Sequence, residues 1–188
     1  MGNTVGSTYV NFCIFNNSVE DAYILGLWCA DGYWWSSSIG LSNMDRILID
    51  KFRSFFAKHF SLERIKFNSN HLFVNSRPLL REFREARKNI INLSAPLIIQ
   101  AYFAGRFDGD GSISKNLKSD CRIVYSNEKE ADIDKTLLGK IGILKTKIYY
   151  YKTANTYCLY VSRLEAGRFL EKILPYSVKM QKLTYVTP

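Results

Sequence analysis

The chain contains two similar segments, and this internal repeat is the strongest constraint on its fold. Residues 21–33 read DAYILGLWCADGY, and residues 100–112 read QAYFAGRFDGDGS. The two segments align at a constant offset of 79 residues, and shorter matches continue downstream at offsets of 84 and 86. A unit of about 80 residues that occurs twice predicts two copies of one supersecondary arrangement in a single chain.

Each unit is predicted to fold as helix, hairpin, helix, hairpin and helix. Its first helix begins near Ser18, which forms a capping-box pattern with Asp21, and in the second copy near Pro96. Alternation and turn residues predict hairpins of 33–35 with 37–42, 63–68 with 71–76, 112–114 with 122–126, and 145–151 with 156–161. Helical apolar spacing predicts the remaining helices at 45–60, 77–88, 128–139 and 163–174.

These elements predict an α+β protein built from antiparallel hairpins and covering helices. The expected organisation is an N-terminal extension at 1–17, repeats at 18–88 and 96–176, a linker at 89–95, and a C-terminal tail at 177–188. No role for the tail follows from its sequence.

The first helix of each repeat carries a stripe of small residues four positions apart. The stripes consist of Ala22, Gly26 and Ala30, and of Ala101, Gly105 and Gly109. Residues spaced by four lie on one helix face, and small side chains there let two backbones approach closely. Glycine inside a helix costs about 1 kcal/mol relative to alanine, so its use in both copies predicts that the two helices pack together.

An aspartate followed by glycine ends each stripe: Asp31 in the first repeat and Asp110 in the second. A carboxylate at a helix C-terminus opposes the helix dipole, and close packing of the helices brings the two like charges together. A divalent cation between them would relieve this repulsion, and hard oxygen ligands suit Mg²⁺ or Mn²⁺. The alternative is that each Asp-Gly pair only terminates its helix.

The charge of the chain favours a polyanionic partner. Its 26 Lys and Arg residues exceed its 17 Asp and Glu residues, giving a net charge of +9 that is spread over both halves. Nucleic acid is the most common partner of a protein with such a basic surface, and an acidic membrane surface is the weaker alternative. The longest apolar run has nine residues, too few to span a membrane. Four scattered cysteines without metal-site spacing indicate reduced thiols and an intracellular location.

Residues 24–32, ILGLWCADG, and 103–111, FAGRFDGDG, resemble the two motifs of the LAGLIDADG homing endonucleases. Two motifs in one chain resemble the single-chain members, in particular the small intron-encoded archaeal enzymes. The first copy departs from the motif, because Cys29 stands where the second copy has Asp108. Both copies keep the final acid, Asp31 or Asp110.

The resemblance implies a pseudo-two-fold monomer in which the motif helices pack at the centre and two four-stranded sheets form a saddle over DNA. It implies cleavage of both strands across the minor groove of a long asymmetric target, leaving short 3′ overhangs. Mg²⁺, for which Mn²⁺ could substitute, would be held by Asp31 and Asp110 with the backbone carbonyls of Ala30 and Gly109. The location would be cytoplasmic if the protein is archaeal, with an organelle left open.

The resemblance also implies polar and basic side chains around the acids. The repeated candidates are Ser42, Asn43, Ser126 and Asn127, each of which could instead cap a helix. Lys115, Lys179 and Lys182 are candidates for a basic residue at the acids. We expect DNA contacts from residues that share one face of a predicted strand or occupy matching positions in the two repeats. These are Ser38, Gly40, Arg64, Lys66, Asn68, Arg77, Arg122, Val124, Lys145, Lys147, Tyr149, Tyr151 and Arg163.

Two other functions remain open for this kind of chain. One is a maturase that assists the splicing of intron RNA, alone or in addition to DNA cleavage. The other is a nucleic-acid-binding regulator without catalytic activity. Retention of both acids favours cleavage.

Overall fold

The structure is a computed structural model that describes residues 18–68, 70–113 and 121–186, with side chains described up to residue 183. The N-terminal extension and the candidate Lys115 lie outside these residues. Within the described ranges, no helix is both long enough and apolar enough to span a membrane.

The first repeat contains three helices and one sheet, joined to the second repeat by a short 3₁₀ turn at Ile90–Asn92. In chain order its elements are α1 (Val19–Asp31), β1 (Gly32–Trp35), β2 (Ser38–Ser42), α2 (Arg46–Ala57), β3 (Lys66–Asn68), β4 (His71–Asn75) and α3 (Arg77–Lys88). The predicted capping box is present, because Ser18 accepts a hydrogen bond from the Asp21 amide and Asp21 accepts one from the Ser18 amide.

The second repeat has the same order of elements and one additional helix. Its elements are α4 (Pro96–Asp110), β5 (Gly111–Ile113), β6 (Cys121–Tyr125), α5 (Glu128–Lys140), β7 (Thr146–Tyr151), β8 (Thr156–Val161) and α6 (Arg163–Ile173), followed by α7 (Val178–Val186). The helix α7 forms most of what the sequence suggested only as a tail.

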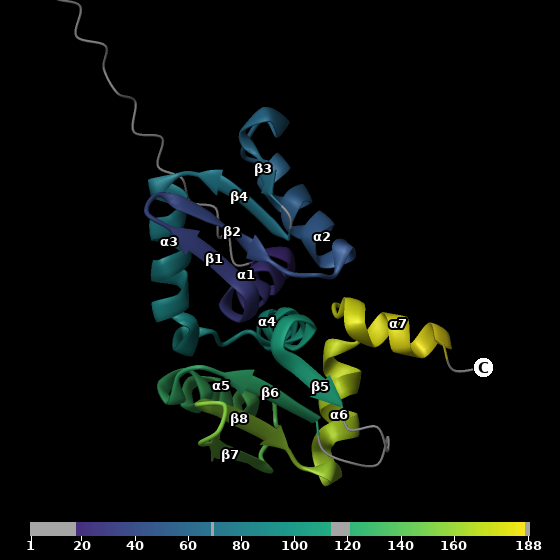
Figure 1. The fold of residues 1–188 in the computed structure, drawn as a ribbon. Helices are drawn as coiled ribbons and strands as arrows, with labels where there is room; N and C mark the ends of the chain where they lie inside the picture. Colours follow the sequence, from purple (N-terminus) through teal and green to yellow (C-terminus); the bar gives the residue numbers. More distant parts are fainter. Residues whose placement is uncertain (1–17, 69, 114–120, 187–188) are drawn as a thin grey trace, which may run out of the picture.

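Both sheets are four-stranded, antiparallel and identical in topology. The strand orders are β1-β2-β4-β3 and β5-β6-β8-β7. Figure 1 shows α1 and α4 side by side at the centre, with one sheet above the pair and the other below it. The predicted α+β fold of two repeats is therefore confirmed.

Two local predictions were wrong. Arg64 ends a 3₁₀ turn at Leu62–Arg64, so it does not share a strand face with Lys66 and Asn68. Its guanidinium instead lies 4.8 Å from the centre of the Phe60 ring and donates a hydrogen bond to the Asn75 carbonyl. Lys145 precedes β7, and its amide donates to the Glu165 carboxylate.

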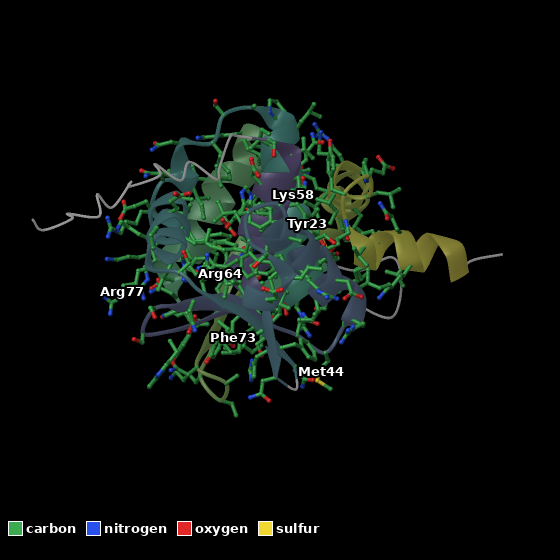
Figure 2. The ribbon with its side chains drawn as sticks, turned by 90° about the horizontal axis from the view of Figure 1, so that it is seen from above. Tyr23, Met44, Lys58, Arg64, Phe73 and Arg77 are labelled. Atoms are coloured by element: carbon green, nitrogen blue, oxygen red, sulfur yellow. The ribbon has the colours of Figure 1, made fainter. Side chains whose placement is uncertain are left out.

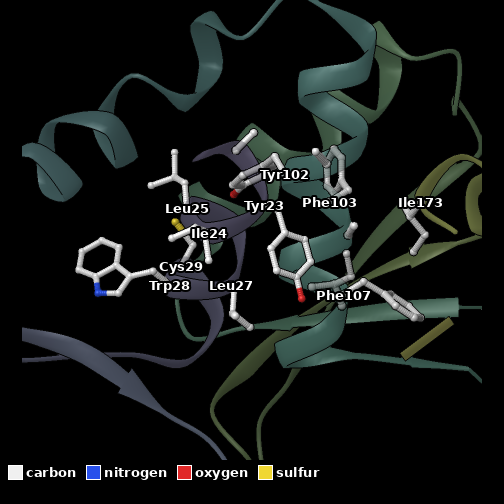
Figure 3. Packing of buried hydrophobic residues seen from close by; sticks show 14 of the residues in the cluster. Tyr23, Ile24, Leu25, Leu27, Trp28, Cys29, Tyr102, Phe103, Phe107 and Ile173 are labelled. Atoms are coloured by element: carbon white, nitrogen blue, oxygen red, sulfur yellow. The ribbon is translucent and has the colours of Figure 1, made fainter. Parts of the chain in front are cut away.

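The central helix pair packs backbone against backbone. A Cβ atom at Gly26 would lie 2.0 Å from the Tyr102 carbonyl oxygen, and one at Gly105 would lie 2.0 Å from that of Tyr23. The small-residue stripes thus lie at the contact between α1 and α4. Figure 3 shows the side chains around this contact, where Tyr23 and Trp28 from α1 and Phe103 and Phe107 from α4 are buried.

We expect Gly26→Ala and Gly105→Ala each to lower the free energy of unfolding by about 3 kcal/mol, because the new methyl group would overlap backbone atoms that cannot rotate away. Urea unfolding measures this. Gly139→Ala in α5 is the matched control, since a Cβ there meets nothing within 4 Å. That control should be stabilised by up to about 1 kcal/mol. Equal effects at Gly26 and Gly139 would contradict the packing.

Candidate functional site

The structure brings the two predicted acids together where α1 and α4 end. A Cβ at Gly109 would lie 2.4 Å from the Ala30 Cβ and 2.6 Å from the Asp31 Oδ2. The Asp31 carboxylate therefore lies against the turn of α4 that carries Asp110. This geometry follows from the stripes, since Ala30 and Gly109 are the small residues of the last turns.

The glycine after each acid is needed for space and not for an unusual backbone conformation. Gly32 and Gly111 have negative φ values of −60° and −82°. A Cβ at Gly32 would lie 2.2 Å from the Trp28 carbonyl oxygen, and one at Gly111 would lie 2.3 Å from the Phe107 ring. The chain can thus turn directly from each acid into the first strand of its sheet.

Both acids are partly buried, and their pKa values rise as a result. Burial raises the pKa of Asp110 to about 6; the Arg106 charge opposes this rise, and the nearby Asp31 carboxylate adds to it. Burial also raises the pKa of Asp31, while a hydrogen bond from Asn43 and the charge of Lys179 act in the opposite direction. The negative charges of two neighbouring carboxylates repel each other, and a cation bound between them would offset this repulsion.

The two acids suit Mg²⁺ better than an ion that requires many protein ligands. No group of three or more His, Cys, Asp and Glu residues that could hold a metal occurs in the described part of the chain. Mg²⁺ keeps several waters and commonly uses one or two carboxylates, so the Asp31 and Asp110 oxygens match its requirements. The contribution of the Ala30 and Gly109 carbonyls stays a prediction.

The pKa of Asp110 gives a prediction for stability. The pKa of Asp110 is about 6 in the folded protein and about 3.9 in the unfolded chain. Between these two pH values, Asp110 is therefore protonated more often in the folded state than in the unfolded state. The free energy of unfolding should therefore fall as the pH rises from 4 to 6. Asp110→Asn should stabilise the metal-free protein at pH 7 by about 1–2 kcal/mol, after allowance for solvent screening.

Urea unfolding in EDTA at pH 4.5 and pH 7 measures this effect. Asp50→Asn is the control, because Asp50 is exposed and pairs with Arg46 at 3.5 Å on the helix surface. Its stability should stay within about 0.5 kcal/mol of the unmodified protein. A less stable Asp110→Asn protein at pH 7 would contradict the assignment of a strained acid pair.

The repeated polar candidates are not equivalent in the structure. The Asn43 Nδ2 donates to the Asp31 Oδ2 at 2.7 Å, and its Oδ1 accepts from the Asp45 amide. Asn43 and Ser42 border a shallow pocket of about 320 Å³ with Asp31. Asn127 instead accepts from the Lys129 amide as the N-cap of α5, and Ser126 is exposed. The capping alternative therefore describes Asn127, while Asn43 contacts an acid.

Sequence reasoning missed the role of Asp108. This residue is 2% exposed and accepts hydrogen bonds from the Tyr23 hydroxyl at 2.7 Å and from the amides of Val178 and Lys179 at 2.8 and 3.0 Å. The Ser177 hydroxyl also donates to it. Asp108 therefore binds the N-terminus of α7. Ser177, which accepts from the Met180 amide, is a helix-capping signal that the sequence contained.

Of the two candidate lysines that the structure describes, Lys179 lies near the acids. Its Nζ donates to the carbonyls of Phe107 at 3.0 Å and Gly111 at 2.7 Å, on both sides of Asp110. Burial lowers the pKa of Lys179, and the charges of Asp108, Asp31 and Asp110 oppose that change. Lys182 pairs with Asp45 at 2.5 Å instead.

Strand pairing defines one outward face on each sheet. On the first sheet this face holds Tyr33, Trp35, Ser38, Gly40, Ser42, Lys66, Asn68, His71, Phe73 and Asn75. On the second it holds Ser112, Arg122, Val124, Lys147, Tyr149, Tyr151, Thr156, Cys158 and Tyr160. Helices cover the opposite faces, where Ile39, Leu41 and Ile123 are buried.

These faces carry more aromatic side chains than the predicted DNA contacts include. The Tyr33 ring lies 5.1 Å from His71 and 6.1 Å from Phe73, while Trp35 is 74% exposed. Figure 2 shows Phe73 and Met44 toward the sheet side of the molecule and Lys58 toward the helices. Only the pairing register places these residues beside the proposed polar ones, so the sequence alone did not identify them.

Basic and aromatic side chains combine on the second sheet. Arg122 donates to the Ser112 Oγ at 3.0 Å and to the Tyr160 hydroxyl at 3.2 Å. An open groove of about 720 Å³ beside them includes Lys145, Lys147, Tyr149, Tyr151 and Tyr160 in its lining. Arg77 and Arg163 are exposed at the first positions of α3 and α6, off the strand faces.

Comparison with known proteins agrees with this arrangement. Residues 98–174 match the family model of the LAGLIDADG-like domain. The fold resembles that of I-DmoI in complex with DNA and Ca, with a TM-score of 0.71, 20% identity, and coverage of 90% of this chain and 99% of that one. The N-terminal LAGLIDADG domain of DUF199/WhiA is also similar, with a TM-score of 0.60, 14% identity, and coverage of 87% and 84%.

The chain therefore has the LAGLIDADG fold in two repeats, and its residues 98–174 are similar to a LAGLIDADG-like domain. A curated relative is the DNA-directed RNA polymerase subunit Rpo1C of Methanocaldococcus jannaschii, which is 25% identical over 175 residues. The match covers 85% of this chain but only 20% of the length of that relative.

Proposed function

We propose that this protein is a site-specific endonuclease that cleaves both strands of double-stranded DNA. The observation that carries the proposal is the crossing of α1 and α4, which places the Asp31 carboxylate against the turn that bears Asp110. Solved structures of I-DmoI contain DNA with Mn or with Ca, and their similar fold supports the same partner and a divalent ion here.

In this proposal the acid pair is the catalytic centre. A bound Mg²⁺, or Mn²⁺ in its place, supplies Lewis-acid stabilisation of charge on the scissile phosphate. Asp31 and Asp110 would hold the ion, and the Asn43 amide keeps the Asp31 carboxylate in one orientation by donating to its Oδ2. The partial burial of both acids keeps the local dielectric low, which strengthens the attraction between their charges and the ion.

The two outward sheet faces would bind the DNA on either side of the acids. Arg122 and Lys147 can reach guanine edges in the major groove, and Asn68 and Asn75 can pair with adenine. Tyrosine, tryptophan and phenylalanine on these faces suit apolar contact with thymine methyl groups. Because the two faces carry different side chains, the target should be asymmetric, and the two cuts should span the minor groove to leave short 3′ overhangs.

The site is complete on one chain, since each repeat supplies one acid and one sheet. We therefore propose that the protein acts as a monomer, within the cell compartment that holds its DNA target. An intron origin of the gene belongs to the same proposal.

The test starts from a randomised duplex library incubated with the protein and Mg²⁺. Cleaved molecules carrying 3′ overhangs, recovered and sequenced, should converge on one long asymmetric site. EDTA should abolish the cuts. A library that is bound but never cut would support a regulator. Binding to an intron RNA with no cut in any duplex would support a maturase and contradict the endonuclease.

A further inference from the structure

The helix α7 contacts the end of α4, which carries Asp110, from outside both repeats. It begins at Val178, beside the buried carboxylate of Asp108, and packs against α4. Figure 1 shows it next to α4 on the side of the central helix pair that faces away from α3. Neither sheet includes it, so the duplicated fold does not require this position for α7.

Two reciprocal contacts join α7 to the last turn of α4. Asp108 accepts hydrogen bonds from the first amides of α7, which satisfies the free N–H groups of that helix. In return, the Lys179 Nζ donates to the carbonyl of Phe107, in the last turn of α4, and to that of Gly111, the residue that follows α4. In the sequence Asp110 lies between Asp108 and Gly111, both of which contact α7, so its backbone is restrained from both sides.

The first repeat holds its acid by different means. Cys29 occupies the position equivalent to Asp108, and it is buried as a free thiol. The side chain of Asp31 accepts instead from Asn43, whose Oδ1 accepts from the Asp45 amide. Asp45 also pairs with Lys182 of α7. The acid of the second repeat is thus held through its backbone and that of the first through its carboxylate.

We propose that α7 positions the acid pair, with Lys179 as the positioning residue of Asp110. The inference rests on the proposed endonuclease function and deepens it. Lys179 acts by fixing the two carbonyls that flank Asp110, and not by contacting the scissile phosphate. Since Lys179 holds the segment that carries the acid of the second repeat, while Asn43 holds the acid of the first, loss of Lys179 should affect the two strands unequally.

The experiment compares Lys179→Met with Lys140→Met. Lys140 is a matched control, because its Nζ also donates to two backbone carbonyls, those of Ile91 at 2.6 Å and Leu93 at 2.9 Å, away from the acids. Single-turnover cleavage of the selected duplex, with each strand labelled separately, measures both rates. Lys179→Met should slow one strand by about 10- to 100-fold more than the other, so that nicked DNA accumulates. Lys140→Met should cut both strands at the original rates.

A second measurement does not depend on cleavage. The Gly111 amide donates to the Phe107 carbonyl, the same oxygen that Lys179 contacts. Hydrogen exchange at Gly111 should accelerate by about tenfold or more in Lys179→Met and stay unchanged in Lys140→Met. Lys179→Arg keeps a cationic donor and should restore part of both effects.

The outcomes separate the two proposals. If the unmodified protein cuts no DNA, the endonuclease is wrong, and the exchange at Gly111 still decides whether Lys179 holds the end of α4. If the protein cuts DNA but Lys179→Met slows both strands equally, or leaves Gly111 exchange unchanged, the positioning role is wrong. Unequal strand cleavage with faster Gly111 exchange supports it.

Discussion

Replacement of either acid by asparagine, Asp31→Asn or Asp110→Asn, is expected to reduce DNA cleavage by at least about a thousandfold. The substitution keeps the size of the side chain and removes the charge that holds a divalent ion, whose loss removes several kcal/mol of transition-state stabilisation. Single-turnover rates on the selected duplex in Mg²⁺ measure the loss.

DNA binding should survive these changes, because the proposed base contacts are made by side chains of the sheet faces and not by the two acids. Affinity measured in Ca²⁺ should stay within about tenfold of the unmodified protein, a difference of about 1.4 kcal/mol. Asp50→Asn, on the exposed surface of α2, serves as the control and should cut at the original rate. Cleavage that persists in both acid variants would disprove the assignment of the catalytic centre.

The second large effect is expected at a buried ion pair inside the second repeat. The Arg106 Nε lies 3.4 Å from the Asp134 Oδ2, and both side chains are 2% exposed. The hydroxyls of Tyr102 and Tyr125 donate to Asp134 at 3.0 and 2.7 Å. Arg106 also lies 4.3 Å from the centre of the Tyr125 ring. The network joins α4 to α5 and β6 one turn before Asp110.

Asp134→Ala should lower the free energy of unfolding by about 3–5 kcal/mol, since it removes the buried carboxylate beside Arg106 and leaves that guanidinium with the more distant Glu130, at 3.9 Å. The double variant Arg106→Met with Asp134→Leu should recover most of this loss, because no unpaired charge remains in the core. Urea unfolding of the single and double variants measures both.

The exposed pair of Arg46 and Asp50 is the comparison for this effect. Arg46→Met should change the stability by no more than about 0.5 kcal/mol, as expected for a solvent-screened pair on a helix surface. A cost for Asp134→Ala as small as that of Arg46→Met would show that the buried network is not required for stability.

The sequence contained most of the information about the scaffold. The repeat at an offset of 79 residues predicted two equal units, and the spacing of Gly26 and Gly105 predicted that their helices pack together. Both depend on local rules: side chains four positions apart share a helix face, and only glycine allows two backbones to approach this closely. The positions of Asp31 and Asp110 at the helix ends follow from the same register.

The sequence was less informative about the surroundings of the acids. Asn43 and Asn127 are equivalent in the alignment, yet one donates to Asp31 and the other caps α5. Arg64 and Lys66 are two positions apart and would share one face of a continuous strand, yet Arg64 belongs to a 3₁₀ turn that precedes the strand. Such differences depend on contacts between segments far apart in the chain, which no periodicity records.

The sequence by itself therefore determined the duplicated α+β architecture, the packing of the two glycine-bearing helices and the identity of the two acids, because these depend on spacing within single elements. The tertiary structure alone decided that Asp108 binds the start of α7, that Lys179 holds the end of α4, and that Tyr33, Phe73 and Tyr160 share the outward faces. Those arrangements depend on strand register and helix docking, which are set by long-range packing and by the need to pair buried polar groups.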